Sequence, residues 1–176
     1  MTEVLYTVRD TVTPESMAID DTYQGVLAYR DGAYRWSPAQ AERFYHAGKR
    51  IYPISVQGAN PHLAQVIDCE NGDLTTTEAA NWARERNNLH HDATVYASVS
   101  TIWGGNLPLL KALAGEPCWL WVAWWQGAPE IPTLELPPNV HIGAVQYKSL
   151  PRVGYDLSAI VSRGWPGSPY GDVAHW

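Results

Sequence analysis

The sequence contains few of the residues that mark disulfide-rich, nucleic-acid-binding or membrane-spanning proteins. Two cysteines, Cys69 and Cys118, are too few for a disulfide framework or a zinc site, and both lie in apolar, strand-like runs as buried thiols do. Lys and Arg number 12 against 18 Asp and Glu, so the net charge is -6 and no basic stripe is present to bind phosphate backbones. No apolar run approaches the roughly 20 residues of a membrane span. We therefore expect neither nucleic acid nor a membrane as a partner.

Signatures of metal and cofactor chemistry are also missing. His90 and His91 are adjacent, so their side chains point apart on a strand or loop, and no other His lies at ligand spacing. The pair is expected in a solvated loop. The sequence has no Gly-x-Ser-x-Gly motif, phosphate-binding loop or dinucleotide fingerprint. We expect no metal, no cofactor and no serine nucleophile.

The composition fits one globular domain. Hydrophobic residues make up 45% of the 176 residues and charged residues 17%, which is ordinary for a chain with one buried core. Residues 1–10 lack a basic segment followed by an apolar run, so we expect no signal peptide. The composition shifts after Arg163 to Gly- and Pro-rich coil. We therefore place the domain at residues 1–163 and a tail at 164–176.

Aromatic residues are unevenly represented. The chain has nine Trp and ten Tyr but one Phe. Trp and Tyr combine a flat apolar face with a hydrogen-bonding edge, which is the surface that sugars bind. The alternative for any single ring is packing in the core or in a protein interface.

Strand-like segments alternate with helix-like ones, a pattern typical of a mostly parallel sheet with helices outside it. Two helices begin with capping boxes, Ser37 with Gln40 and Thr75 with Glu78. We expect the first to end near His46 and the second to continue through residue 86, with a third, short helix at 107–114. Strands are expected at 1–9, 25–29, 51–56, 65–69, 94–98, 118–123 and 140–146. Seven strands are one fewer than a full barrel needs, so the predicted fold is an irregular or truncated (β/α) barrel, similar to a TIM barrel.

One acidic pair stands out, in residues 66–70 (VIDCE). Alternate strand residues face the same way, so Asp68 and Glu70 are predicted to point together at the end of an apolar strand, where barrel enzymes carry catalytic groups. Two carboxylates in one desolvated site push their pKa values apart, leaving one protonated and one ionised. Cleavage of a glycosidic bond requires that arrangement. Paired acids at loop entries are also common as solvated or capping groups.

Several later segments follow this pair in a recognisable order. They are residues 95–98 (VYAS), 120–123 (LWVA), 145–147 (VQY) and 155–157 (YDL). Together with residues 67–70 they resemble the successive strand ends of glycoside hydrolase family 25, the lysozyme-like N-acetylmuramidases, over residues 4–160.

The resemblance implies a catalytic cluster. Asp68, Glu70 and Asp156 match the family's acidic positions, and Asp10 is the best match for its first-strand Asp, with Asp20, Asp21 and Asp31 as competitors. Glu70 would be the general acid and Asp68 would stabilise charge at the sugar or orient its acetamido group. Asp10 and Asp156 would keep the site polar.

The same resemblance implies substrate-binding residues. Tyr96, Trp121, Gln146 and Tyr147 match positions that line the family's groove. Core packing is the alternative for each. Within residues 119–125, which contain four Trp, only one strand face can point into the barrel, so some of these rings must be structural.

Two functions follow as hypotheses. The first is a glycosidase that cleaves the glycan strands of peptidoglycan, with Glu70 and Asp68 at its centre. The second is a non-catalytic virion or surface module that binds glycan, other virion proteins or itself. A protein can keep the fold of an enzyme family without its catalytic activity, so the fold alone does not decide between the two. The sequence also resembles small family-25-like proteins of actinobacterial phages, which implies a protein located in the virion or released at lysis.

The tail carries a separate prediction. Trp165, Tyr170 and Trp176 lie among Gly and Pro residues that build neither a helix nor a central strand. Each exposed ring forgoes on the order of 2 kcal/mol of burial. We therefore expect these rings to pack across the barrel or into a neighbouring subunit.

Overall fold

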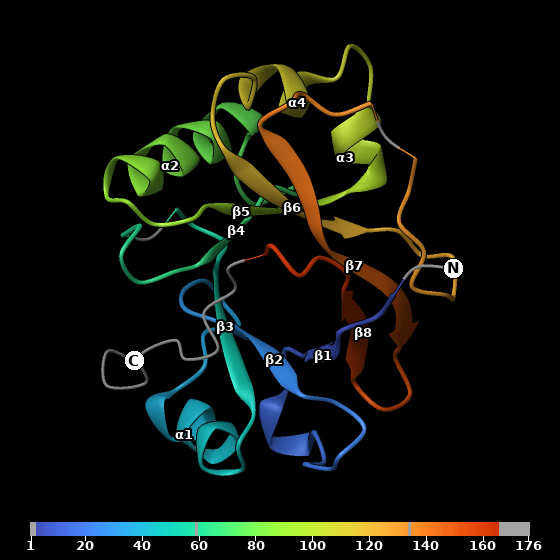
Figure 1. Cartoon of the computed structure of the whole chain (residues 1–176). Helices are drawn as coiled ribbons and strands as arrows, with labels where there is room; N and C mark the ends of the chain where they lie inside the picture. The colour runs from blue at the N-terminus through green and yellow to red at the C-terminus, as the bar shows by residue number, and fades with distance from the viewer. Residues whose placement is uncertain (1–2, 59, 134, 166–176) are drawn as a thin grey trace.

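The computed structural model describes residues 3–58, 60–133 and 135–165, and these form a closed barrel of eight strands (Figure 1). The strands follow one another around the barrel in sequence order. They are β1 (Tyr6–Asp10), β2 (Gly25–Tyr29), β3 (Arg50–Ser55), β4 (Val66–Asp68), β5 (Thr94–Ser98), β6 (Cys118–Ala123), β7 (Val140–Leu150) and β8 (Tyr155–Ile160).

The barrel is irregular in the direction of its last strand. The seven strands from β1 to β7 run parallel to one another, whereas β8 is antiparallel to both of its neighbours, β7 and β1. The predicted α/β barrel is therefore confirmed, but the strand count of seven was wrong. The eighth strand follows β7 through the turn at 151–154, and it closes the sheet.

The helices agree with the capping signals. Helix α1 (Pro38–His46) begins after Ser37 and α2 (Thr76–Asn88) after Thr75, each with both hydrogen bonds of a capping box. The third expected helix is present as α4 (Pro108–Ala112). The sequence did not predict α3 (Val99–Trp103) or the short 3-10 helix η1 (Pro14–Ser16).

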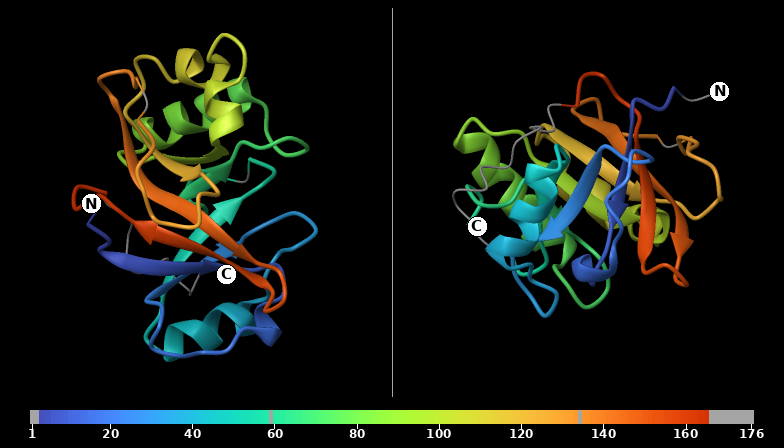
Figure 2. Two further views of the ribbon diagram at one scale, coloured as in Figure 1. Left: turned by 90° about the vertical axis from the view of Figure 1, so that its right-hand side faces the viewer. Right: turned by 90° about the horizontal axis from the view of Figure 1, so that it is seen from below.

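The helices cover only part of the barrel. Helices α2, α3 and α4 lie together beside β4, β5 and β6, while α1 packs on β3 at the other side (Figures 1 and 2). Strand β7 has 11 residues and pairs extensively with β8, and no helix in the described part of the chain makes extensive contact with either strand. No helix in the described part of the chain is long and apolar enough to cross a bilayer.

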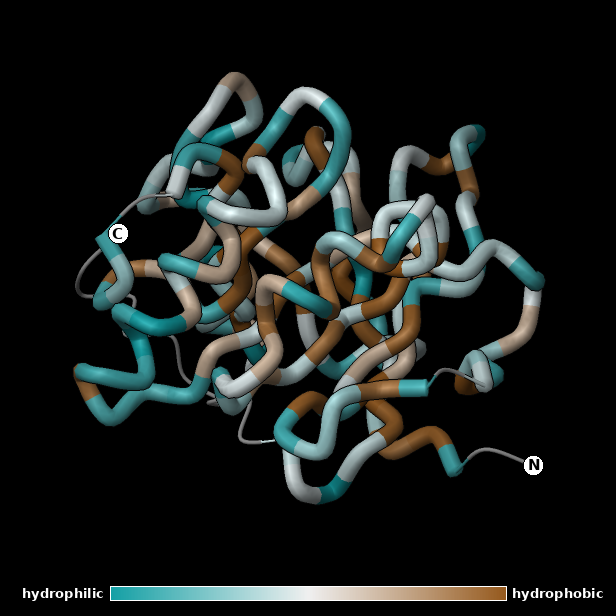
Figure 3. Tube along the Cα trace, turned by 90° about the horizontal axis from the view of Figure 1, so that it is seen from above, coloured by the Kyte–Doolittle hydropathy of each residue, from teal (hydrophilic) through white to brown (hydrophobic). Residues whose placement is uncertain are grey.

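Apolar residues fill the barrel interior. Val8, Leu27, Val66, Trp121 and Ala144, from five strands, belong to one buried cluster inside the barrel. Separate clusters lie between the sheet and α1 and between the sheet and α2 to α4. In the tube view the apolar segments run through the middle of the molecule, with hydrophilic loops around them (Figure 3).

Trp165 belongs to this interior. Its ring centroid lies 5.2 Å from that of Tyr52 and 5.6 Å from that of Trp121, and its indole N–H donates to the Thr94 hydroxyl at 3.0 Å. Gly143 allows this approach, since a Cβ there would lie 2.7 Å from the Trp165 ring. The prediction that this ring packs against the barrel is confirmed.

The tail boundary at 163 therefore leaves out one core residue. Trp165, assigned to the tail, is 8% exposed. Tyr170 and Trp176 lie outside the described residues, as does most of the segment 164–176.

The two cysteines are buried thiols, as the sequence predicts. Cys69 and Cys118 are both buried and free, and burial raises the pKa of each thiol to about 12.

Candidate active site

The inward-facing residues change from apolar to polar toward the carboxyl ends of the parallel strands. On β1, Val8 lies in the apolar interior and Asp10 follows two residues later; on β4, Val66 is followed by Asp68 in the same way. Alternate strand residues share a face, so each carboxyl group lies above an apolar neighbour. The carboxyl end of the barrel thus carries a layer of acids.

A further acid of this layer, Asp156, lies on β8, the strand that runs in the opposite direction. In the antiparallel pairing of β1 with β8, Asp156 lies directly opposite Asp10. Directly opposite residues of an antiparallel pair have their side chains on the same face, with Cβ atoms about 5 Å apart. Asp156 is partly exposed, and its charge raises the pKa of Asp10.

Asp10 is 8% exposed, and only one of its two carboxyl oxygens accepts hydrogen bonds. Its Oδ2 accepts from the Tyr29 hydroxyl at 3.3 Å and from the Gln146 amide at 3.4 Å, while its Oδ1 is buried with no hydrogen-bond partner. Burial, then the charge of Asp156, raises the pKa of Asp10 to about 7. The two hydrogen bonds oppose that rise. Asp10 is therefore poised to hold or release a proton near neutral pH.

Asp68 is buried to a similar degree, at 5% exposed, and its Oδ1 also has no hydrogen-bond partner. Burial raises the pKa of Asp68 to about 8, and the charges of Glu70, Asp73 and Asp10 add to the rise. A carboxyl in that environment keeps its proton at neutral pH.

Glu70 lies beyond the end of β4 and is half-buried. Strand β4 ends at Asp68, so the alternation argument does not itself place Glu70, although the backbone N–H of Cys69 continues the pairing with Tyr96 at 2.9 Å. Burial and the charge of Asp73 raise the pKa of Glu70, and a backbone hydrogen bond with Ser98 opposes the rise. Of the two acids in the Asp-x-Glu pair, Glu70 is the more accessible.

Of the competing aspartates, Asp20 and Asp21 lie away from the acid layer, whereas Asp31 follows the carboxyl end of β2. Asp20 pairs with Arg9 on the outside of the barrel at 3.1 Å, and Asp21 is exposed in the same loop. Asp31 accepts from the Ser55 hydroxyl at 2.5 Å and from the Val56 backbone at 2.8 Å. Asp10 is the only one of these four at the carboxyl end of β1.

Three of the four residues predicted to line a groove are buried. Tyr96 is 6% exposed and donates from its hydroxyl to the Gln146 side-chain oxygen at 2.5 Å, and Gln146 is 1% exposed. Trp121 has no exposed surface and donates to the Ser158 hydroxyl at 3.0 Å, among the apolar residues of the barrel interior. Tyr147 is half-buried, at a bulge in β7.

Sequence reasoning missed Tyr29. This side chain occupies the carboxyl end of β2 and bonds to Asp10, and burial and the nearby carboxylates raise the pKa of its hydroxyl. Its place at the end of a predicted strand was the available signal. Exposed rings also follow strand ends at this edge of the barrel: Tyr34 after β2, Trp103 after β5 and Trp125 after β6.

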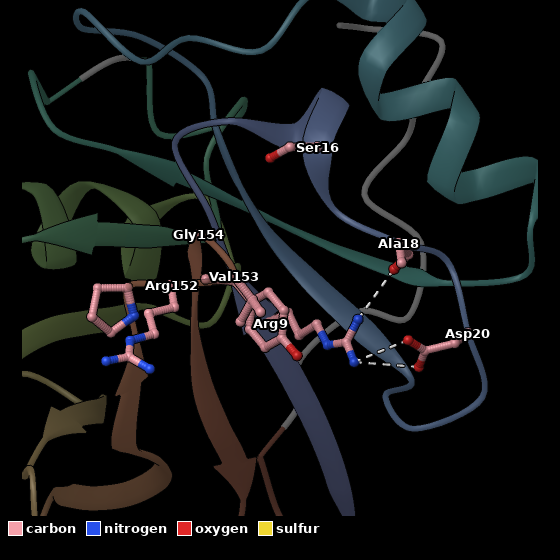
Figure 4. A pocket seen from close by; sticks show the side chains of 9 residues that line it. Arg9, Ser16, Ala18, Asp20, Arg152, Val153 and Gly154 are labelled. Atoms are coloured by element: carbon pink, nitrogen blue, oxygen red, sulfur yellow. Dashed lines mark hydrogen bonds and ion pairs between the residues drawn. The ribbon is translucent and has the colours of Figure 1, made fainter.

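A pocket of about 520 Å³ lies on the outer side of β1 and β8 (Figure 4). Arg9 alternates with Asp10 and so faces away from the acid layer. Its guanidinium lies between the rings of Tyr23 and Tyr155, 4.1 and 4.3 Å from their centroids, and bonds to Ala18 and Asp20. These contacts hold the 13–22 loop against the barrel.

The described residues contain no group of three or more His, Cys, Asp and Glu side chains arranged to hold a metal ion. His90 lies after the end of α2 with a positive φ of 59°, and the His91 ring packs edge-on against that of His62. The histidine pair therefore lies away from the acid layer, on the loop that precedes β5.

No protein-family model matches this chain, and no curated protein does. Solved structures with a similar fold exist. An uncharacterized protein from B. stearothermophilus aligns over 90% of this chain and 96% of its own, with a TM-score of 0.63 and 13% identity. A family GH25 lysozyme from Aspergillus fumigatus aligns over 90% of this chain and 95% of its own, with a TM-score of 0.59 and 12% identity.

These similarities define the class of fold. The chain is an eight-stranded α/β barrel with an acidic layer at the carboxyl ends of its strands, and it shares the barrel of a lysozyme at low sequence identity. The Asp-x-Glu pair, Asp10 and Asp156 all lie at this end of the barrel.

Proposed function

We propose that this protein is a glycoside hydrolase that cleaves the glycan strands of bacterial peptidoglycan. The observation that carries the proposal is the arrangement of Asp10, Asp68, Glu70 and Asp156 at one end of the barrel, with raised pKa values at the first three. Catalytic residues of such barrels come from the carboxyl ends of different strands. The barrel shared with a GH25 lysozyme supports the same reaction class.

The acid layer provides a source of protons. Four carboxyl groups at one end of the barrel do not all ionise at neutral pH, because burial and mutual repulsion favour the neutral forms. Glu70 is the most suitable general acid, since its pKa is raised and its side chain is only half-buried. It would protonate the leaving oxygen, while Asp68 below it would interact with the sugar on which charge develops.

The exposed rings supply a binding surface. Trp103 is 42% exposed and Trp125 49% exposed, and each follows a strand that ends at the acid layer. Sugar rings stack on aromatic faces of this kind. These residues replace Trp121 as the proposed stacking positions, because the Trp121 ring has no exposed surface.

The test is the loss of turbidity, or the release of reducing ends, from purified cell walls. Glu70→Gln should lower the rate by roughly 100-fold or more, because it removes the general acid while keeping the side-chain shape. Glu42→Gln, at an exposed position on α1, is the matched control and should retain the wild-type rate. Equal rates for the two variants would refute the proposal.

A specific observation favours a second candidate, a non-catalytic glycan- or protein-binding module. Tyr96, Trp121 and Gln146, three of the four expected substrate contacts, are buried in the described structure. Under this hypothesis purified cell walls retain both wild-type protein and Glu70→Gln, and neither releases reducing ends. A virion location remains a prediction, which mass spectrometry of purified particles would test.

A further inference from the structure

The two oxygens of Asp10 have different surroundings. Oδ2 receives two donors, the Tyr29 hydroxyl at 3.3 Å and the Gln146 amide at 3.4 Å. Oδ1 is also buried, yet no donor or acceptor in the described residues reaches it. A buried polar atom without a partner is costly and calls for an explanation.

The neighbouring side chains fix this asymmetry. The Tyr96 hydroxyl donates to the side-chain oxygen of Gln146 at 2.5 Å, so the amide nitrogen of Gln146 must point the other way, toward Asp10. Gln146 is 1% exposed and has little room to turn. Tyr29 approaches the same Asp10 oxygen from β2, on the opposite side of β1 from β8. Three strands other than β1 thus determine how the carboxyl group is turned.

We propose that Tyr29, Gln146 and Tyr96 are positioning residues, which hold Asp10 so that its carboxyl proton resides on Oδ1. Oδ2 then remains the carbonyl oxygen that accepts both hydrogen bonds, and Oδ1 becomes an O–H donor. Protonation of the Asp10 carboxylate adds one proton from the solvent to Oδ1 and breaks no other bond in the protein. The protonation state does not depend on the proposed activity, but its use in glycan cleavage rests on the proposed function.

The charged groups around Asp10 agree with this geometry. Asp156 faces it from β8, and Asp68 and Glu70 lie on the β4 side of the layer. All three are acids, and no cation is among the main causes of the raised pKa of Asp10. The cation next in sequence, Arg9, points to the outside of the barrel, where Asp20 pairs with it. Around neutral pH the carboxyl therefore takes up a proton readily.

A protonated Asp10 has a chemical role that an ionised one lacks. It can donate a hydrogen bond from Oδ1, and because no acceptor of the described residues reaches that oxygen, the acceptor would be an oxygen of a bound sugar. Held in this way, Asp10 helps to keep a neighbouring acceptor in place while Glu70 supplies the proton to the leaving group. Asp10 is then more than a polar residue of the layer.

Carboxyl titration tests the proposal without any measurement of activity. The protonated carboxyl stretch of Asp10 is followed by infrared spectroscopy against pH and assigned by its loss in Asp10→Asn. In wild type we expect a midpoint near neutral pH. Tyr29→Phe removes one donor and should shift the midpoint upward by about one pH unit, because hydrogen bonds to a carboxylate favour its ionised form. Tyr96→Phe should give a smaller upward shift by freeing the Gln146 amide.

Tyr52→Phe is the matched control, since Tyr52 is a buried barrel tyrosine whose hydroxyl lies near Arg50 and not near Asp10. A wild-type midpoint close to 4 would overturn the proposal, as would equal midpoints in Tyr29→Phe and Tyr52→Phe. Near-ultraviolet circular dichroism establishes that each variant is folded. If cell-wall cleavage is absent while the titration behaves as expected, the proposed function fails and this inference stands.

Discussion

Asp10 at the end of β1 lies directly opposite Asp156 near the start of β8, in the antiparallel pairing that closes the barrel. The pairing brings together two acids that are 146 positions apart in the chain. It depends on the reversed direction of β8, because a parallel eighth strand would carry the beginning of its sequence to the other end of the barrel. The pairing of β1 with β8 therefore both closes the sheet and brings Asp156 into the acid layer.

This pairing predicts the effect of Asp156→Asn. After burial, the charge of Asp156 is the largest cause of the raised pKa of Asp10, so its removal should lower that pKa by roughly one unit. The infrared titration of Asp10 measures the shift. Asp21→Asn, in an exposed loop, should leave the pKa unchanged. A midpoint that does not move in Asp156→Asn would show that the two side chains do not interact.

The raised pKa values also predict how stability changes with pH. Asp10 and Asp68 have folded-state pKa values of about 7 and about 8, against 3.8 without the protein environment. The folded protein therefore binds more protons than the unfolded chain between about pH 4 and 8, and its stability falls as the pH rises through this window. At about 1.4 kcal/mol per pKa unit, the two shifts lead us to expect the free energy of unfolding to decrease by up to about 8 kcal/mol from pH 4 to 8.

Urea unfolding at a series of pH values measures this slope. Asp68→Asn should flatten the curve, since the amide does not titrate. Glu42→Gln, at an exposed helix position, should reproduce the wild-type curve. A wild-type stability that rises over this window would contradict the prediction.

Trp165 is expected to be a core residue. Trp165→Ala removes the ring that contacts Tyr52 and Trp121, and should lower the free energy of unfolding by about 3–5 kcal/mol. Thermal unfolding measures the change, and deletion after residue 163 should lower the melting temperature as well. Trp125→Ala, at a ring that is 49% exposed, provides the comparison and should change stability by less than about 1 kcal/mol.

Substitutions of Trp121 and Trp125 should have different effects, the first on stability and the second on glycan binding. Trp121→Phe leaves the Ser158 hydroxyl without its indole donor and opens space in the barrel interior, so we expect a loss of roughly 1–3 kcal/mol of stability. Trp125→Ala should leave stability nearly unchanged and weaken retention on purified glycan strands about 5- to 10-fold. The opposite pattern, with Trp121 affecting retention alone, would restore Trp121 as a substrate contact.

The local features of the sequence determined much of the fold. The capping boxes at Ser37 and Thr75 depend on residues three positions apart, and both helices begin where they predict. The apolar run before Asp68 likewise predicts a buried strand, and it forms β4. These signals involve short separations in the chain, so neighbouring residues suffice to define them.

The tertiary structure decided what those local signals leave open. The sequence does not state that residues 155–160 reverse direction and close the sheet, because that depends on pairing with β1 at the other end of the chain. It does not distinguish Trp121, which fills the interior, from Trp125, which is exposed, since both belong to one aromatic run. The hydrogen bonds of Tyr29 and Gln146 to one oxygen of Asp10 arise only when three strands meet around a closed barrel, which brings side chains far apart in sequence within bonding distance.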